Sequence, residues 1–593
     1  MERNEMNKKQ LRFSIILAVL ILIFVAAGLY MSSTRPLAHL FDKEEIEETG
    51  GSEVSVDPLQ NESSQTALSL AQSSRRAEEE EIQKEIVVSP YIVRARELLK
   101  SNGGKKAETL SYIYTTKRAV SFLFSGIGNA KTVDGVLSSL KKTNSVGMFF
   151  VTEDEIRQCD EQIRKIIAAK MPIGISYAAG AFNDAESLLA NWLETMDLLS
   201  EQYGYQDVKY VRQISGSASD DCRTAVSAAN LTLVQQNLEA IPTAAAYTDT
   251  GSEVIDLLFP DGKTNLQRGQ MVHFRMDIIQ NSVTVVPQVV TLLATEKTDY
   301  SVVALSDILE DTKLLYNWPL SEDQILPEVL NAIHPGQLTG KDELAAFSSR
   351  YIGIYWVDSM YFLPGFSSKE IVALDKRGKL RNDKNYVFLT FDDWGTDYSI
   401  DPILQVLKKH NVKATFFIRT SNVKYNPNLL RAIAMDGHDI ASHTDTHFQL
   451  SNMVTNTKYS ELSAEQRDQL EKDLVRSYEV LQSTIGDIRT SNGPALTRYF
   501  RPPTLAVSRS GLRTVLDCGF TYSISGSYTT GDYNATSAKR LSAQMMDNTS
   551  SGAVLVLHMS ETAEYTAEAV DLYLTELEAQ GRLKAVPLSA FLK

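Results

Sequence analysis

The sequence predicts a chain of the α/β class with two tandem domains, each built on a parallel sheet, behind one N-terminal membrane helix. Three observations carry this prediction. Short apolar runs alternate with segments of helical spacing from about residue 118 onward. The same ordered series of segments occurs twice along the chain. A charge-free apolar run near the N-terminus is long enough to span a bilayer.

The bulk composition is that of a multidomain globular protein. At 593 residues the chain is too long for a single core and predicts about three or four units. The net charge of −15 argues against a nucleic-acid partner. The three cysteines, Cys159, Cys222 and Cys518, are widely spaced, so we expect buried free thiols rather than a disulfide framework or a CxxC metal site.

The N-terminal run, residues 13–31, predicts a transmembrane signal-anchor helix. It has no charge over nineteen residues, which at 1.5 Å per residue spans the roughly 30 Å hydrocarbon layer. Basic residues precede it, so residues 1–12 are expected to be a cytoplasmic tail and the rest of the chain to lie outside the cell membrane. A cleavable signal peptide is the alternative, although its apolar core is usually about 7–15 residues.

Residues 32–104 predict a low-complexity, flexible stalk. The segment is rich in Glu, Ser and Gln and has few apolar residues to bury. Its last part, "SPYIVRARELLKSNG", is expected to form a short helix that leads into the folded part. Anchor and stalk together place the working domain at a distance from the membrane.

An internal repeat defines the two domains. "AVSFLFSG" and "SVGMFFVT" read as buried strands on either side of "TVDGVLSSLKKT", which has helical spacing. Phe124 and Phe391 lie 267 residues apart, as do Phe149 and Phe416. Since strands that alternate with helices form a parallel sheet covered by helices, the repeat predicts two such domains. Their expected bounds are 105–310 and 381–593, joined by a connecting region at 311–380 to which no role is assigned.

In the second copy, polar side chains follow apolar runs. The carboxyl ends of parallel strands meet at one edge, where catalytic groups gather, so we expect these side chains to share a pocket. The residues are Asp392 and Asp393 after "YVFLTF", His443 and His447 in "DIASHTDTH", Arg498 and Arg501 in "RYFRPP", and His558 in "GAVLVLHMS".

Two histidines and a carboxylate suit a divalent metal ion, Zn²⁺ or else Co²⁺, Mn²⁺ or Ni²⁺. His443 and His447 are four residues apart, so one helical turn would aim both at one ion. An ion of this kind lowers the pKa of water to roughly 7. A second carboxylate would act as general base, and His558 would protonate the leaving group. The set indicates hydrolysis of an amide or ester, although each motif alone is more often structural.

The second copy resembles the NodB-type polysaccharide deacetylases, carbohydrate esterase family 4. "TFDD", "HTDTH", "RYFRPP" and "VLHM" are similar to four motifs of that family. The resemblance implies a distorted (β/α) barrel that removes N-acetyl, and sometimes O-acetyl, groups from chitin-like or peptidoglycan sugars. By the same resemblance we expect the fold class to be two tandem barrels of this type, the first degenerate.

The resemblance also implies roles for single residues. It makes Asp393, His443 and His447 the metal ligands. It makes Asp392 the catalytic base, His558 the catalytic acid and Arg501 the residue that tunes the base, with Arg498 as second choice. The backbone N–H of Thr504 would stabilise the oxyanion.

Three positions depart from the family's pattern. Trp394 stands where the family commonly has Gly, and Thr504 replaces a common Tyr. A further family motif, an Asp shortly before Asp-Trp, is matched only by Asp532-Tyr533. Trp394 and Tyr533, like Tyr528, are candidates for stacking on sugar rings, with packing in the core as the alternative.

The first copy lacks the same set of groups. By alignment, Ser125 and Gly126 take the places of the two aspartates, and Ala178 and about Phe182 those of the two histidines. Arg275 replaces His558, while Arg212 keeps the place of Arg501. Without these ligands the copy is expected to be catalytically inactive, serving as a spacer, a positioning element or a binding domain for glycan or protein.

These observations predict a membrane-anchored, metal-dependent polysaccharide N-deacetylase on the outside of a bacterium. The expected substrate is the N-acetylglucosamine of peptidoglycan. Three alternatives stay open: a deacetylase of a secreted exopolysaccharide such as poly-N-acetylhexosamine or a Pel-like polymer, an esterase acting on O-acetyl groups, and a non-catalytic glycan-binding or assembly scaffold.

Overall fold

The computed structural model describes residues 88–593 except 183, 296–299, 339–342 and 355–361. The predicted membrane helix at 13–31 and the stalk up to residue 87 lie outside the described residues, so both remain predictions. Within the described part of the chain, we find no helix that is long and apolar enough to cross a membrane.

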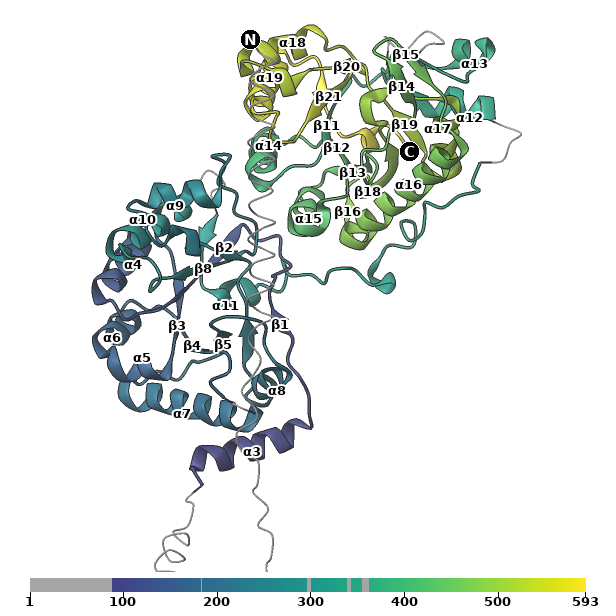
Figure 1. Cartoon of the computed structure of the whole chain (residues 1–593). Coiled ribbons are helices and arrows are strands. Elements are labelled where there is room, and N and C mark those ends of the chain that lie inside the picture. The colour runs from purple at the N-terminus through teal and green to yellow at the C-terminus, as the bar shows by residue number, and fades with distance from the viewer. Residues whose placement is uncertain (1–87, 183, 296–299, 339–342, 355–361) are drawn as a thin grey trace, which may run out of the picture. The chain divides into compact units, whose positions relative to one another are not determined.

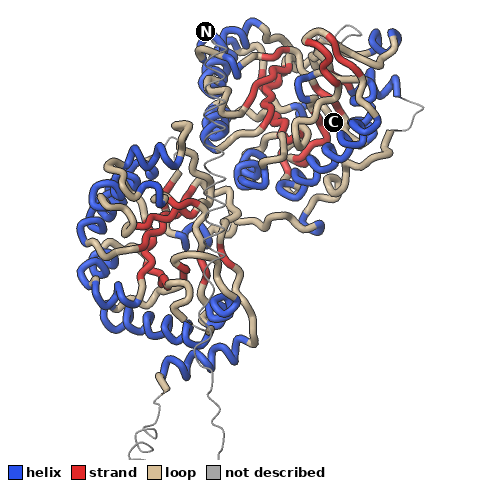
Figure 2. The backbone as a smooth tube through the Cα atoms, in the orientation of Figure 1, coloured by secondary structure: helices blue, strands red, loops and turns tan. Residues whose placement is uncertain are grey.

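The first folded part, here called the N-terminal domain, is a parallel half-barrel sheet with helices outside the strands (Figures 1 and 2). Its strand order is β1-β6-β5-β4-β3-β2-β8-β7, with β9 paired to β2. The strands are β1 (Thr109–Leu110), β2 (Ala119–Ser125), β3 (Gly147–Val151), β4 (Ile173–Tyr177), β5 (Tyr210–Gln213), β6 (Thr232–Val234), β7 (Leu238–Glu239), β8 (Met271–Arg275) and β9 (Ser301–Val302). The helices are α3 (Pro90–Asn102), α4 (Ala130–Lys142), α5 (Glu153–Gln158), α6 (Asp160–Ala168), α7 (Ala185–Tyr203), α8 (Asp220–Ala228), α9 (Gly251–Leu258), α10 (Ser282–Ala294) and α11 (Leu305–Leu309).

The second folded part, the C-terminal domain, has a sheet of the same kind, ordered β10-β19-β18-β13-β12-β11-β21-β20 with β22 paired to β11. Its strands are β10 (Tyr351–Ile352), β11 (Tyr386–Asp393), β12 (Thr415–Ile418), β13 (Asp439–Ser442), β18 (Leu496–Phe500), β19 (Tyr522–Ile524), β20 (Tyr528–Thr529), β21 (Val554–His558) and β22 (Lys584–Ala585). Two small hairpins pair β14 (Asn452–Thr455) with β15 (Lys458–Ser460) and β16 (Arg489–Thr490) with β17 (Gly493–Pro494). The helices are α12 (Glu343–Arg350), α13 (Ser368–Ala373), α14 (Asp397–Lys409), α15 (Pro427–Met435), α16 (Ala464–Ile485), α17 (Arg509–Asp517), α18 (Ala538–Asp547) and α19 (Thr566–Gln580).

The central strands are buried because they carry almost unbroken apolar runs, as parallel strands covered by helices require. All seven residues of β2 and most of β11 are buried. Phe124 stacks on Phe149 with ring centroids 4.9 Å apart, and the matching pair Phe391 and Phe416 stacks at 5.0 Å. The two parallel sheets therefore agree with the two α/β domains that the sequence predicts.

Two predicted boundaries need correction. Helix α3 lies inside the range 32–104 expected to be a stalk, but it packs on α7 and α8, because Tyr91, Ile92, Leu98 and Leu99 join their apolar cluster. The connecting region 311–380 is partly an element of the C-terminal domain, since β10 pairs with β19 as β1 pairs with β6. The sequence predicts the helix but not its packing on the domain, and the two-residue strand β10 is too short to stand out by periodicity.

Candidate active site and metal centre

Strand β11 brings two carboxylates to the carboxyl edge of the C-terminal sheet. Asp392 pairs in register with Phe417 on one side and with His558 of β21 on the other. Asp393 is the last residue of the strand and has a φ of 78°, a left-handed conformation that costs a non-glycine residue energy. Asp393 thus stands at the carboxyl end of the strand, as the sequence predicts.

The two histidines of "HTDTH" follow strand β13, and the expectation of one helical turn is wrong. Residues 443–449 form an irregular turn in which Thr444 and His447 have φ values of 67° and 66°. These left-handed residues fold the loop back, so the rings of His443 and His447 lie 5.1 Å apart between centroids. A bent loop therefore provides the proximity that helical spacing was expected to provide.

Asp393, His443 and His447 form a group of three side chains that could hold a metal ion. Their ligand atoms lie within 4.8 Å of one another, with Asp393 Oδ1 at 3.8 Å from His443 Nε2 and 3.7 Å from His447 Nε2. Atoms bound about 2.1 Å from one tetrahedral ion stand roughly 3.4 Å apart, so the spacing fits a single ion.

The protonation of the histidines also fits a metal centre. His443 Nδ1 lies 2.8 Å from the carbonyl oxygen of Arg501. Because a carbonyl only accepts, Nδ1 carries the hydrogen, which leaves Nε2 free as a ligand. Burial lowers the pKa of His443 to about 3 and also lowers that of His447. Both rings are therefore neutral at physiological pH, as metal ligands must be.

Asp392 is held by a buried arginine. Arg501, which is fully buried, donates from Nη1 to Asp392 Oδ1 at 2.6 Å and to Thr390 Oγ1 at 2.7 Å. Burial raises the pKa of Asp392, while the charges of Arg501 and His558 act against that rise. Arg498, the second choice for this role, is exposed and lines a cavity away from Asp392 with Tyr478 and Lys593. The geometry thus favours Arg501.

His558 is oriented by Asp532, a residue not predicted to belong to the site. His558 Nδ1 donates to Asp532 Oδ1 at 2.7 Å, and the backbone N–H of His558 donates to Oδ2 at the same distance. Burial would lower the pKa of His558, but the hydrogen bond and charge of Asp532 outweigh it and raise that pKa to about 9. The sequence signal for this contact was the partial match to a family motif at Asp532-Tyr533. The structure shows that Asp532, as well as Tyr533, lies beside His558.

The four residues expected to touch substrate lie in different settings, and Tyr528 is partly buried against the main apolar core. Tyr533 is 51% exposed, and its ring stands edge-on to His558 with centroids 5.1 Å apart, so a sugar ring can reach it. Trp394 is partly buried and packs against the main apolar core, which favours the core alternative. Thr504 is exposed at a φ of 59°, and its role as oxyanion donor remains a prediction.

The same edge of the N-terminal domain carries different groups. Ser125 pairs with Arg275 as Asp392 pairs with His558. Gly126 has a φ of 80°, like Asp393, but a Cβ there would lie 2.7 Å from Asp277 Oδ1. The space of the first ligand is therefore occupied by Asp277.

The alignment of Ala178 and Phe182 with the histidines is wrong by two residues. Ile175 pairs with Val151 as Ser442 pairs with Ile418, which puts Ser176 at the place of His443. Four residues further, Gly180 has a φ of 76° and matches His447. The pairing of the strands fixes this alignment. Alignment by residue similarity alone placed the loop residues two positions too far along the chain. Gly126, Ser176 and Gly180 thus stand at the places of Asp393, His443 and His447, and none of the three is a His, Cys, Asp or Glu.

Fold and site define an α/β half-barrel protein with an Asp-His-His candidate metal centre beside a buried Asp-Arg pair and a His-Asp pair. The sequence profile described as polysaccharide deacetylase matches residues 379–523. A chitooligosaccharide deacetylase from a Bradyrhizobium species is 30% identical over 172 residues, which cover 29% of this chain and 69% of that protein. The chain belongs to the polysaccharide deacetylase family.

A further relative and a solved structure are also similar to part of this chain. A peptidoglycan-N-acetylglucosamine deacetylase of Bacillus cereus is 28% identical over 202 residues, 34% of this chain and 66% of the relative. The chain thus spans just under two thirds of that relative's length. Among solved structures, the crystal structure of a peptidoglycan N-acetylglucosamine deacetylase matches at 22% identity with a TM-score of 0.31, covering 43% of this chain and 96% of the other.

Proposed function

We propose that the C-terminal domain is a metal-dependent hydrolase that removes N-acetyl groups from a polysaccharide, with the N-acetylglucosamine of peptidoglycan as the substrate sugar. The observation that carries the proposal is that one sheet edge holds the Asp-His-His group, the Asp392–Arg501 pair and the His558–Asp532 pair. The name of the Bacillus cereus relative supports the choice of sugar.

The candidate metal centre comprises Asp393, His443 and His447. A divalent ion held there, Zn²⁺ or else Co²⁺, Mn²⁺ or Ni²⁺, supplies Lewis acidity that acidifies water and polarises a carbonyl. The neutral histidines and the strained Asp393 give the site its ligands without further rearrangement of the backbone.

The remaining residues move protons. Asp392 accepts a proton from the attacking water as the water oxygen bonds to the acetyl carbon, and the adjacent Arg501 guanidinium favours the ionised form of Asp392 that this step needs. His558 donates a proton from Nε2 to the amide nitrogen as the C–N bond breaks, because Nδ1 already donates to Asp532. With a pKa of about 9, His558 carries that proton at neutral pH. The products are acetate and a free amine on the sugar.

We also propose that this domain works outside the cell on a membrane-anchored chain whose N-terminal domain is inactive. The apolar run 13–31 and the basic residues before it support the anchor. The inactivity of the N-terminal domain is supported by the residues at the matching edge of its sheet, which offer no set of metal ligands. These residues are Ser125, Gly126, Ser176 and Gly180. Membrane fractionation and protease accessibility of intact cells test the location.

Acetate release tests the activity. The full chain would be incubated with peptidoglycan, chitooligosaccharides and acetylxylan, with chelator or with added Zn²⁺ or Co²⁺. We expect release that needs metal, prefers peptidoglycan and is lost in Asp392→Ala and in His443→Ala. Release from acetylxylan alone would indicate an esterase. Neither release nor metal binding would leave the binding scaffold as the function.

A further inference from the structure

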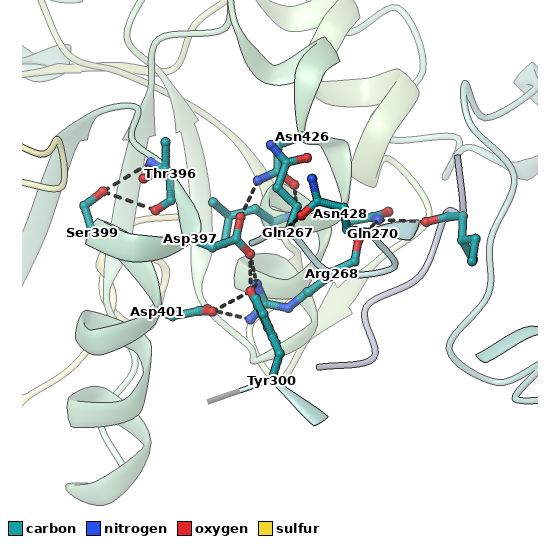
Figure 3. Close-up of polar contacts among 12 residues, drawn as sticks. Gln267, Arg268, Gln270, Tyr300, Thr396, Asp397, Ser399, Asp401, Asn426 and Asn428 are labelled. Atoms are coloured by element: carbon teal, nitrogen blue, oxygen red, sulfur yellow. Dashed lines mark hydrogen bonds and ion pairs between the residues drawn. The ribbon is translucent and has the colours of Figure 1, made fainter. Parts of the chain in front are cut away.

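The N-terminal domain reaches the C-terminal domain through a buried polar network (Figure 3). Arg268, in the segment before β8, is 3% exposed and donates to two carboxylates of helix α14. Its Nη1 lies 2.8 Å from Asp397 Oδ1 and its Nη2 lies 2.6 Å from Asp401 Oδ1. The hydroxyl of Tyr300, from the residue before β9, contacts both carboxylates as well.

The partners of Arg268 follow directly on the catalytic carboxylates. Asp397 is the first residue of α14 and stands four positions after Asp393. It is fully buried, and besides Arg268 and Tyr300 it accepts a hydrogen bond from Asn426, the residue that caps α15. Side chains of the N-terminal domain, together with Asn426, therefore hold the start of α14 and with it the turn that leaves β11.

A second contact reaches the turn that follows the catalytic acid. Lys263 Nζ donates to the carbonyl oxygen of Glu561 at 3.0 Å, three residues after His558. The Glu561 carboxylate in turn accepts from the backbone N–H of Thr396 at 2.7 Å. Glu561 thus ties the turn after His558 to the turn after Asp393, and the segment 263–268 contacts the first of these turns through Lys263 and the helix that follows the second through Arg268.

Asn428 adds four further hydrogen bonds to this junction. Asn428 of α15 is fully buried, and its amide donates to the carbonyls of Ile113 and Arg268, each at 2.8 Å. Its oxygen accepts from Thr115 N at 3.0 Å and from Tyr316 at 2.8 Å. Buried charges and amides without such partners would be costly, so these residues fit an environment that only the N-terminal segments supply.

We propose that segment 263–268 of the N-terminal domain is a clamp that positions the two catalytic turns, with Arg268 as its main positioning residue. The inactive domain is thereby a working part of the active site, although it contributes no group to the reaction. Arg268 acts through Asp397 on the turn that carries Asp392 and Asp393. The effect on turnover rests on the proposed deacetylase function, whereas the effect on the turn's motion does not.

The test uses the full chain with Arg268→Met and two readouts. Hydrogen exchange of amides 394–401 is expected to become at least about tenfold faster, because the turn loses its anchor. The kcat for acetate release from peptidoglycan is expected to fall at least about tenfold with KM within about twofold, because misplacement of catalytic groups lowers kcat. Arg268→Lys, which keeps the charge, is expected to recover part of both. Arg157→Met, at an exposed arginine of the same domain, is the matched control and is expected to change neither.

A second variant separates positioning from charge. Arg268→Met combined with Asp397→Asn and Asp401→Asn leaves no buried charge unpaired. The clamp predicts that fast exchange and low kcat persist in this triple variant, whereas full recovery of both would overturn it. If Arg268→Met does not fold, the triple variant and Lys263→Met carry the test.

The remaining outcomes also support or overturn the proposed clamp. Unchanged exchange at 394–401 in a folded Arg268→Met protein overturns the proposal. Faster exchange with unchanged kcat overturns the link to catalysis. If the wild-type chain releases no acetate from any substrate, the proposed function fails on its own, and the exchange data still support or overturn the clamp.

Discussion

His558 and Asp532 show how a single contact sets the chemistry of a residue. Asp532 accepts both the ring Nδ1–H and the backbone N–H of His558, and it also accepts from Thr566 Oγ1 at 2.7 Å. The carboxylate therefore fixes the ring's orientation, its tautomer and its charge together. A histidine at a strand end without such a partner would stay largely neutral above its ordinary pKa of about 6.5.

We expect Asp532→Asn to lower activity and to move its alkaline limit toward lower pH. The negative charge of Asp532 raises the pKa of His558 to about 9, so its removal lets the proton leave at lower pH. The pH profile of kcat/KM measures this, with a loss of roughly 10–100-fold near pH 8. Thr566→Val keeps the carboxylate and is the control. An unchanged alkaline limit in Asp532→Asn would contradict the assignment of His558 as acid.

The strain at Asp393 predicts a trade between stability and metal binding. At a φ of 78° a glycine is free of the steric cost that Asp393 bears, and the matching residue Gly126 has a φ of 80°. We therefore expect Asp393→Gly to raise the free energy of unfolding by about 1 kcal/mol in chelator while abolishing metal binding. Urea denaturation measures the first and calorimetric titration the second. Asp393→Asn keeps the strain, so a similar gain in that variant would argue against a backbone cause.

At the scale of elements, strand ends could be predicted from the sequence and loop shapes could not. The apolar runs of β11 and β21 place Asp392 and His558 at one edge because parallel strands share a direction. The path of residues 443–449 depends on left-handed residues, Thr444 and His447, which no periodicity reveals. Asp532 lies 26 residues before its partner, so the contact becomes visible only once β20 and β21 pair.

The residue before strand β13, His438, is a buried histidine. Its burial predicts that the protein loses stability in acid. His438 is 1% exposed, and its Nδ1 accepts from the backbone N–H of Ala414 at 3.1 Å, so the ring is neutral. Burial, with help from the Lys413 charge, lowers the pKa of His438 to about 3. As pH falls below about 6.5, the unfolded chain binds a proton that the folded chain refuses, so stability is present at neutral pH and is lost toward acid.

Because of His438, we expect the free energy of unfolding to fall by about 2 kcal/mol as the pH is lowered from 6.5 to 5. In His438→Gln this decrease in the free energy of unfolding should be absent. Urea denaturation at a series of pH values measures it as the slope of that free energy against pH. His334→Gln, at an exposed histidine, serves as control and should keep the wild-type slope. Equal slopes in His438→Gln and wild type would show that the ring is not held neutral.

For the whole molecule, the repeat predicted two domains but not the dependence of one on the other. Matching strands could be recognised because apolar runs and their order survive sequence change. The junction could not, since Arg268, Asp397 and Asn428 are ordinary polar residues in the sequence and their partners lie as far as 315 residues away. Only the folded chain shows that these side chains are buried together.

Asn428 allows the dependence between the domains to be measured. All four of its described hydrogen bonds go to residues outside the C-terminal sheet, namely Ile113, Thr115, Arg268 and Tyr316. While these bonds are intact, opening either domain breaks buried contacts of the other, so we expect both to unfold in one transition. Asn428→Ala leaves the partners unpaired, which costs on the order of 3 kcal/mol and weakens the coupling between the domains.

Calorimetry of the full chain should therefore show one peak for wild type and two for Asn428→Ala, with the lower peak matching the loss of amide protection in α14 and α15. Asn548→Ala, at the exposed end of α18, removes a hydrogen bond that stays within its own helix and should keep one peak. Two peaks already in wild type would mean that the domains fold independently. In that case the polar network would hold two separate folds together without making either depend on the other.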